Sequence, residues 1–227
     1  MKLRTLVAVL GLLAACGVPP DVNDPPKVEQ TSTAPYSSLH GMYFKVVDDG
    51  STYMQQLFDH VPGDHPEGVT AEIEHWRIEG GGEVTDHFLV ARTPELVTRY
   101  LAAHPSLAVP HDRELAFGQL DGNGWRTYLL VPTAELDATS IAHAEVSRDP
   151  NTDRPSVLLD FTAPAARHFG ELTAKITGHK LAVLVDGSVV SAPVINGPIT
   201  GGRAMVTFGP SATDATAHAL ADSLGAP

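Results

Sequence analysis

Residues 42–47 have an alternating pattern in which Met42, Phe44 and Val46 would share one face of an extended strand. A period of two is typical of a half-buried strand. Similar extended runs follow, and Asp121-Gly122-Asn123-Gly124 between two of them indicates a hairpin. The pattern therefore predicts further strands at residues 88–91, 115–120, 125–131, 141–146, 157–161, 181–185, 188–191 and 204–208.

Four other segments have the period of an amphipathic helix. Thr93 is expected to cap one helix, with Pro94 in its first turn, and Thr162 is expected to cap another. Ser211 with Asp214 resembles a capping box for the last helix. The predicted helices cover residues 55–61, the segment from Thr93 to His104, the segment from Thr162 to Gly178, and residues 215–224.

The order of these elements indicates the fold class. From residue 141 onward it is strand, strand, helix, strand, strand, strand, helix. Such an order favours an α+β fold, with helices packed on one face of a mainly antiparallel sheet.

The first sixteen residues have the pattern of an export signal. A basic start, Met1–Arg4, precedes the apolar run Leu6–Leu13 and the ending Leu13-Ala14-Ala15-Cys16. The run is too short to cross a hydrocarbon core of about 30 Å, so residues 1–15 are predicted to be a signal peptide. The ending resembles a bacterial lipobox, which implies cleavage before Cys16 and attachment of lipid, palmitate included. The alternative is an ordinary secretory signal in which Cys16 is incidental.

Composition divides the rest of the chain into three predicted parts. Residues 16–38 are rich in proline and polar residues and are expected to form a disordered tether. Residues 39–138 are expected to form an N-terminal α+β region, and residues 139–227 a second domain. No other stretch is long and apolar enough for a membrane helix, so membrane contact is expected only through the N-terminal lipid.

The net charge of the chain argues against nucleic acid as a partner. The chain has a formal charge of −12 at pH 7, and binding to phosphates relies on clustered Lys and Arg. We therefore expect no binding to nucleic acid.

Histidines are numerous, which raises the question of a metal. Asp59-His60 and Asp64-His65 form the densest cluster, with Pro62-Gly63 between them. A bend there could gather ligands suited to zinc. No second fixed pair of ligands follows, so solvated surface histidines are the preferred interpretation, and neither a metal nor a cofactor is predicted.

A second candidate for metal binding lies at Asp149, Asn151 and Asp153, which copy the first positions of a calcium loop. Asp160 falls at the twelfth position, but Arg154 replaces the glycine that the bend requires. A plain turn is therefore predicted.

Catalytic patterns are missing from the sequence. It has no G-x-S-x-G motif, its single cysteine is assigned to the anchor, and no carboxylate pair suited to glycoside cleavage is evident. The chain is therefore predicted not to be an enzyme.

A multi-part motif carries a family resemblance. It contains Leu181-Ala182-Val183-Leu184-Val185-Asp186-Gly187, then Ser191-Ala192-Pro193-Val194-Ile195, then Ile199-Thr200-Gly201-Gly202. In this order the segments resemble the first periplasmic domain of the SecD/SecDF protein-export family, over residues 140–224. The resemblance implies a SecD periplasmic-head-like fold in a module thought to contact emerging secreted chains.

Each part of the motif also has a structural explanation. Asp186-Gly187 suits a tight turn that needs positive φ, and Gly201-Gly202 supplies conformational freedom at a hinge. Pro193 blocks ladder pairing, so Pro193, Val194 and Ile195 form a candidate edge for binding a client peptide.

These observations lead to one functional hypothesis and one alternative. The hypothesis is a non-enzymatic lipoprotein whose SecD-like head binds unfolded secreted proteins or the Sec translocon. It would lie in the bacterial cell envelope, facing the periplasm or the cell exterior, and Gly17 after the cysteine is compatible with delivery to an outer membrane. SecD relatives have membrane helices that this sequence lacks, so no coupling to a proton gradient is expected. The alternative is a cell-envelope binding or structural lipoprotein that reuses the fold outside export.

Overall fold

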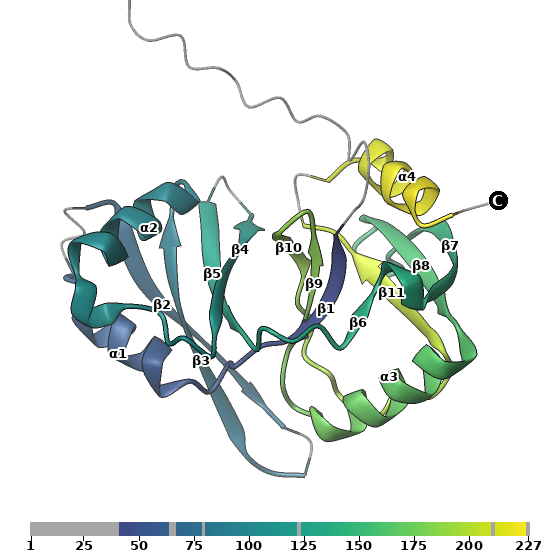
Figure 1. Ribbon diagram of the computed structural model, residues 1–227, viewed down its shortest axis with the longest axis horizontal. Coiled ribbons are helices and arrows are strands. Elements are labelled where there is room, and N and C mark those ends of the chain that lie inside the picture. The colour runs from purple at the N-terminus through teal and green to yellow at the C-terminus, as the bar shows by residue number, and fades with distance from the viewer. Residues whose placement is uncertain (1–40, 64–66, 79, 122–123, 210–211, 226–227) are drawn as a thin grey trace, which may run out of the picture. The chain divides into compact units, whose positions relative to one another are not determined.

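The apolar strands assemble into two sheets in the computed structural model, which describes residues 41–63, 67–78, 80–121, 124–209 and 212–225. The larger sheet has eight strands in the order β2-β3-β5-β4-β10-β9-β1-β6 (Figure 1). Its neighbouring strands are antiparallel, apart from the parallel pair β10 and β4. The strands are β1 Met42–Val46, β2 Val69–Arg77, β3 Glu83–Ala91, β4 Glu114–Leu120, β5 Gly124–Leu130, β6 Leu136–Asp137, β9 Leu181–Val185 and β10 Ser188–Ser191.

The smaller sheet has three antiparallel strands in the order β11-β8-β7. These are β7 Ile141–Arg148, β8 Pro155–Phe161 and β11 Arg203–Thr207. Two 3₁₀ turns, η1 Pro105–Leu107 and η2 Ala138–Ser140, connect elements elsewhere.

Helices α1 (Thr52–His60) and α2 (Pro94–Ala103) cover β2, β3 and β5 and enclose what we call the N-terminal core. Each helix directs its apolar stripe at the sheet, as the period of 3.6 requires. The buried members of this core are Met54, Leu57, Val69, Leu89, Ala91, Val97, Tyr100 and Leu129.

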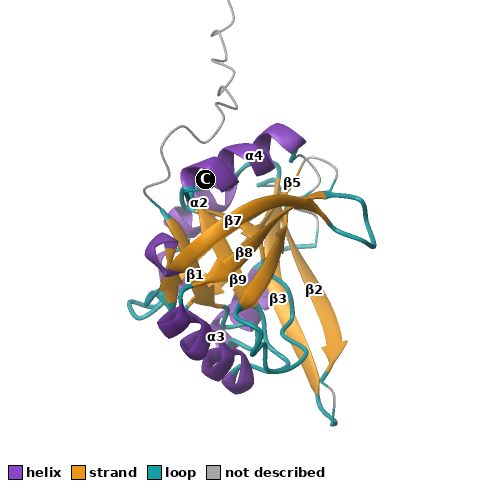
Figure 2. Ribbon diagram, turned by 90° about the vertical axis from the view of Figure 1, so that its right-hand side faces the viewer, coloured by secondary structure: helices purple, strands orange, loops and turns teal. Residues whose placement is uncertain are grey.

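Helices α3 (Ala163–Lys175) and α4 (Asp214–Ser223) pack with the smaller sheet, β1 and β9 around the C-terminal core. Three rings at its centre, Phe44, Phe161 and Phe169, have centroids 4.6 to 6.2 Å apart. Such offset and edge-on contacts add to the stability that burial alone provides. Figure 2 shows α4 at the top and α3 at the bottom of the view, and side chains of both helices belong to the same core.

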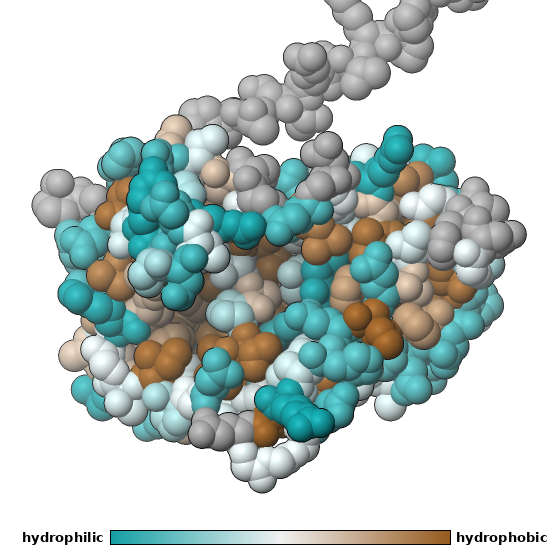
Figure 3. Space-filling model, turned by 180° about the vertical axis from the view of Figure 1, so that it is seen from behind, coloured by the Kyte–Doolittle hydropathy of each residue, from teal (hydrophilic) through white to brown (hydrophobic). Residues whose placement is uncertain are grey.

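A third apolar cluster lies between the two cores on the other face of the larger sheet. It joins Ala116 and Leu130 of β4 and β5 with Ala182 and Leu184 of β9. The face seen in Figure 3 is mainly hydrophilic with scattered apolar patches. The exposed large apolar side chains among the described residues are Tyr43, Ile73 and Met205.

The structure confirms the α+β class with mainly antiparallel strands. It also confirms the order of elements from residue 141 onward, and the hairpin between β4 and β5. The predicted division at residues 138 and 139 stays a prediction. The larger sheet contains strands from both sides of that division, since β1 pairs with β9 and β4 pairs with β10.

The structure differs from the sequence predictions in several places. The helix predicted from residue 55 begins at Thr52, because the Ser51 hydroxyl accepts a hydrogen bond from the Tyr53 N–H (3.2 Å). Strand β2 was not predicted. The capping box at Ser211 and Asp214 was wrong: Ser211 lies outside the described residues, and Thr213 and Thr216 form the box.

Two predicted caps are also absent as side-chain contacts. Thr93 and Thr162 stand at the N-cap positions, but neither hydroxyl caps its helix. The Leu96 N–H, which the Thr93 hydroxyl could have bonded, donates to the Thr93 carbonyl instead (3.2 Å).

Candidate functional site

The turn at Asp186-Gly187 joins β9 to β10. Both residues have positive φ, 49° and 80°, which a two-residue hairpin of this hand requires. Val185 pairs with Ser188 directly across the turn. The Asp186 N–H donates to the Gly41 carbonyl (3.2 Å), so the turn is bonded to the residue that precedes β1.

Gly202 lies against helix α3. Its φ is 68°, and a Cβ there would stand 3.2 Å from the Cβ of Ala166. Its carbonyl accepts a hydrogen bond from the Phe161 N–H (2.9 Å). A Cβ on Gly201, by contrast, would meet nothing within 4 Å. Close approach therefore restricts Gly202, not Gly201.

The candidate client-binding edge, Pro193–Ile195, lies alongside residues 178–181. The Leu181 N–H donates to the Pro193 carbonyl (3.1 Å), and the Ile195 N–H donates to the His179 carbonyl (2.9 Å). Ile195 is also buried. Between these bonds Val194 stands opposite Lys180. Hydrogen bonding alternates along such a pair, so the N–H and C=O of Val194 point to the other side.

Lys180 is the centre of a buried group of charges that we call the ionic cluster: Glu74, Asp86, Arg126 and Lys180. The Lys180 Nζ donates to Asp86 Oδ2 (2.6 Å) and to Glu74 Oε2 (2.7 Å). Arg126 donates to the same two oxygens, at 2.7 Å and 3.1 Å. Asp86, Arg126 and Lys180 have side chains less than a tenth exposed. The cluster therefore joins β2, β3 and β5 to the start of β9.

Aromatic rings surround the two cations of the cluster. The Lys180 Nζ lies 4.5 Å from the centroid of the Trp76 ring, and the Arg126 guanidinium carbon lies 3.7 Å from that of Phe88 and 4.6 Å from that of Tyr128. Cation–π contacts of this kind strengthen when they are shielded from water. Burial also raises the pKa of Tyr128, which keeps this hydroxyl neutral.

Glu74 is the exposed member of the cluster. Burial opposes its ionisation, but the hydrogen bonds and charges of Lys180 and Arg126 outweigh burial, and the pKa of Glu74 is lowered. Glu74 is thus ionised in the folded protein at neutral pH, which gives the cluster two carboxylates for its two cations.

Three further contacts, made by Trp76 and Asp49, hold residues 178–180 in place. The Trp76 Nε1 donates to the Gly178 carbonyl (2.7 Å). Asp49, 2% exposed, accepts from the Lys180 N–H and contacts His179 Nδ1, both at 2.7 Å. The segment that pairs with Pro193–Ile195 is therefore bound on its other sides as well.

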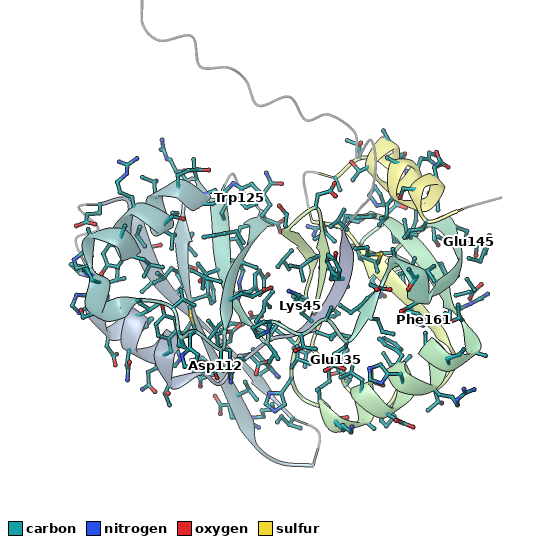
Figure 4. All side chains as sticks on the ribbon, in the orientation of Figure 1. Lys45, Asp112, Trp125, Glu135, Glu145 and Phe161 are labelled. Carbon is teal, nitrogen blue, oxygen red and sulfur yellow. The ribbon has the colours of Figure 1, made fainter. Side chains whose placement is uncertain are left out.

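A simpler ion pair lies nearer the surface. Lys45 of β1, labelled near the middle of Figure 4, donates to Glu114 of β4 (2.6 Å). It links β1, which packs in the C-terminal core, to β4.

The structure also places the residues considered for metal binding. Asp64 and His65 lie outside the described residues, whereas His60 stacks edge-on against His104 (5.4 Å between centroids). These two rings line a hollow with Tyr100 and Glu67. Within the described ranges no three metal-ligating side chains converge.

Asp149 forms a turn of its own. It accepts hydrogen bonds from the Asn151 and Thr152 N–H groups (2.9 Å each), and these bonds lower its pKa. Asp160 is ion-paired with Arg203. The loop at residues 149–155 therefore contains a turn closed by the Asp149 side chain.

Comparison with known proteins identifies the C-terminal half. The family described as SecDF, P1 head subdomain, matches residues 114–226. Residues 114–226 belong to the SecDF P1 head family. The confirmed SecD-like fold includes every strand and helix that carries the motif, from β7 to α4.

Relatives of the SecD family extend the match at lower identity. The SecD translocase subunit of Acidaminococcus fermentans is 36% identical over 80 residues, which are 35% of this chain and 19% of the relative. That of Acetobacter pasteurianus is 28% identical over 212 residues, covering 80% of this chain and 40% of the relative. The chain thus spans less than half the length of these two proteins.

A solved structure, described as a membrane component SecDF that enhances protein export, aligns with a TM-score of 0.38 and 21% identity. It covers 82% of this chain and 94% of that one. In the described part of this chain, no helix has the length and apolarity needed to span a membrane.

Sequence reasoning missed the ionic cluster entirely. Lys180 directly precedes the apolar run of β9, and its partners Glu74 and Asp86 stand 106 and 94 residues away in the sequence. One available signal was the lysine itself, since a cation next to a fully buried strand requires a buried partner.

Proposed function

We propose that this chain is an accessory protein of protein export whose P1-head-like half binds extended segments of exported polypeptides. The match of residues 114–226 to the SecDF P1 head carries this proposal. The names of the relatives, protein translocase subunit SecD, support a role beside the translocon.

Val194 is the proposed point of contact within the candidate edge. Its outward N–H and C=O have no hydrogen-bond partner among the described residues, whereas Pro193 and Ile195 bond to residues 178–181. An extended client could continue the pairing on the Val194 side, as in other cases of strand addition.

The anchor is the second part of the proposal. Cys16 lies outside the described residues, and the sequence Leu13-Ala14-Ala15-Cys16 supports its lipidation. Acyl chains on Cys16 would hold the protein at a membrane of the cell envelope, since each buried methylene contributes about 0.8 kcal/mol. Metabolic labelling with a fatty acid tests this step, and we expect Cys16→Ala to abolish incorporation. Unchanged labelling of the variant would contradict it.

Photocrosslinking in cells tests the export role. A photoreactive amino acid at Val194 is expected to label secreted chains or a translocon subunit. The same amino acid at Glu171, exposed on α3, serves as the control. Labelling of neither class of target from Val194 would overturn the proposal, and labelling of envelope proteins alone would favour a lipoprotein that reuses this fold outside export.

A further inference from the structure

Strand β2 is the outer strand of the larger sheet. It pairs with β3 along its whole length, from Val69 opposite Ala91 to Arg77 opposite Glu83. Figure 2 shows it at the margin of the sheet. Among the described residues no other strand pairs with its outer side. β2 therefore presents an unpaired edge nine residues long.

The register shows which residues direct backbone groups outward. The Ile78 N–H donates to the Gly82 carbonyl (3.0 Å), directly beyond the pair formed by Arg77 and Glu83. Bonded and non-bonded pairs alternate along an antiparallel ladder. The even-numbered residues of β2 therefore bond to β3, and odd-numbered residues, with Ile73 at the centre, direct their N–H and C=O groups outward.

The side chains beside this edge differ between its two faces. On the face that carries α1 and α2, Ile73 is 44% exposed. On the opposite face Glu72 and Glu74 are exposed. Glu74 has one oxygen bonded to Lys180 and Arg126, and Glu72 has no ion-pair partner within the described ranges.

These charges disfavour a second copy of the chain as the occupant. Two β2 strands paired antiparallel about Ile73 would place Glu72 of each copy opposite Glu74 of the other. Like charges directly opposite one another destabilise a strand pair. A segment with basic residues at these positions would instead be attracted, and the net charge of −12 favours its approach.

We infer that the edge of β2 binds an extended polypeptide segment in which basic residues alternate with apolar ones. Its backbone pairs with the outward groups of Ala71, Ile73 and His75. Its basic side chains lie beside Glu72 and Glu74, and an apolar side chain lies beside Ile73. The inference rests on the proposed function and adds a second contact surface and a preference for basic, alternating segments.

Peptide binding to the purified full chain tests this preference. The probes are two fluorescein-labelled heptapeptides, one alternating lysine with valine and the other alternating glutamate with valine. Fluorescence anisotropy is expected to show binding of the lysine peptide at least about tenfold tighter than the glutamate peptide. Equal affinities would overturn the inference.

Two variants locate the site on β2. Ile73→Pro removes an outward N–H and the apolar side chain while the bonds of the even-numbered residues to β3 remain, and it is expected to weaken binding of the lysine peptide about tenfold. Glu72→Lys is expected to weaken binding of the lysine peptide by more than Ile73→Pro does. Glu171→Lys, the same charge change on α3, should have no more than a slight effect on this binding. Unchanged binding by Glu72→Lys would place the peptide elsewhere, even if Ile73→Pro fails to fold.

Hydrogen exchange supplies a pattern that a nonspecific charge effect would not produce. In the free protein the amides of Ala71, Ile73 and His75 should exchange faster than those of Thr70, Glu72 and Glu74. The lysine peptide is expected to slow the first set alone. Slowing of neither set, or of both equally, would contradict strand addition. These measurements use isolated peptides, so their outcome is separable from crosslinking at Val194: labelled export partners with no binding at β2 would overturn this inference alone.

Discussion

The two cores of the molecule are stabilised differently. The C-terminal core is enclosed by a sheet, two helices and strands β1 and β9, with a cluster of phenylalanine rings at its centre. The N-terminal core is smaller, and its sheet joins the other region partly through the ionic cluster. Apolar burial has no preferred direction, whereas buried ion pairs require one geometry. The cluster is therefore expected to fix how the N-terminal core joins the rest of the larger sheet more than it adds to stability.

Removing the central cation is expected to have the largest effect. Lys180→Met leaves Asp86 and Glu74 with Arg126 alone, and breaking a buried pair in this way costs about 3–5 kcal/mol. Urea denaturation measures the loss. Both tryptophans, Trp76 and Trp125, lie in the N-terminal region. In this variant the unfolding transition followed by their fluorescence should therefore have a lower urea midpoint than the one followed by far-ultraviolet circular dichroism.

Two further variants test the cause of that loss. Lys175→Met, at an exposed position on α3, should change stability little. Adding Asp86→Leu to Lys180→Met should restore part of the lost stability, because an apolar group replaces the uncompensated charge. A double variant less stable than Lys180→Met would contradict this account.

Matched truncations compare the cores themselves. Leu57 and Leu220 are both fully buried, one in each core, and Leu→Ala at either site is expected to cost about 2–5 kcal/mol. If the regions unfold together, Leu220→Ala should shift the tryptophan fluorescence midpoint as much as the circular dichroism midpoint. A shift in circular dichroism alone would mean that the ionic cluster does not couple the two cores.

A substitution at Gly178, which lies against Ile78 just after β2, should cost less stability than the variants above. Gly178 has a φ of 88°, and a Cβ there would stand 2.7 Å from the Ile78 side chain. Gly178→Ala is therefore expected to cost about 1–3 kcal/mol in thermal or urea unfolding. Gly197→Ala is the control, since a Cβ at Gly197 meets nothing within 4 Å. Equal stability of the two variants would mean that the backbone yields at Gly178.

The smallest expected effect is a dependence on pH. Because the pKa of Glu74 is lowered on folding, its contribution is present above the unfolded value of about 4.3 and is lost as the pH falls through the folded value. Glu74→Gln should therefore flatten the fall in urea midpoint between about pH 5 and about pH 3. Glu72→Gln on the same strand is the control, and equal slopes for both variants would contradict the assignment.

Much of the fold followed from local pattern. The apolar run of β9 and the Asp186-Gly187 turn predicted a hairpin that the structure contains. Strand β2 was missed although Val69, Ala71 and Ile73 alternate with polar residues, because alanine and glutamate have low strand propensity. The partners of Lys180 depend on tertiary contacts that no local pattern shows, and the bonds made by Pro193 and Ile195 become visible only with residues 178–181 in place.

The pairing of β1 with β9 also leads us to expect an order of folding. Met42 stands opposite Val185, so the first described strand has no partner on that side until almost the whole chain is available. Contacts between such distant residues slow folding, because the entropy of closing the intervening loop is lost before the contact stabilises the chain. In refolding, the N-terminal core, whose buried residues all lie between Met54 and Leu129, is therefore expected to form before β1 pairs with β9.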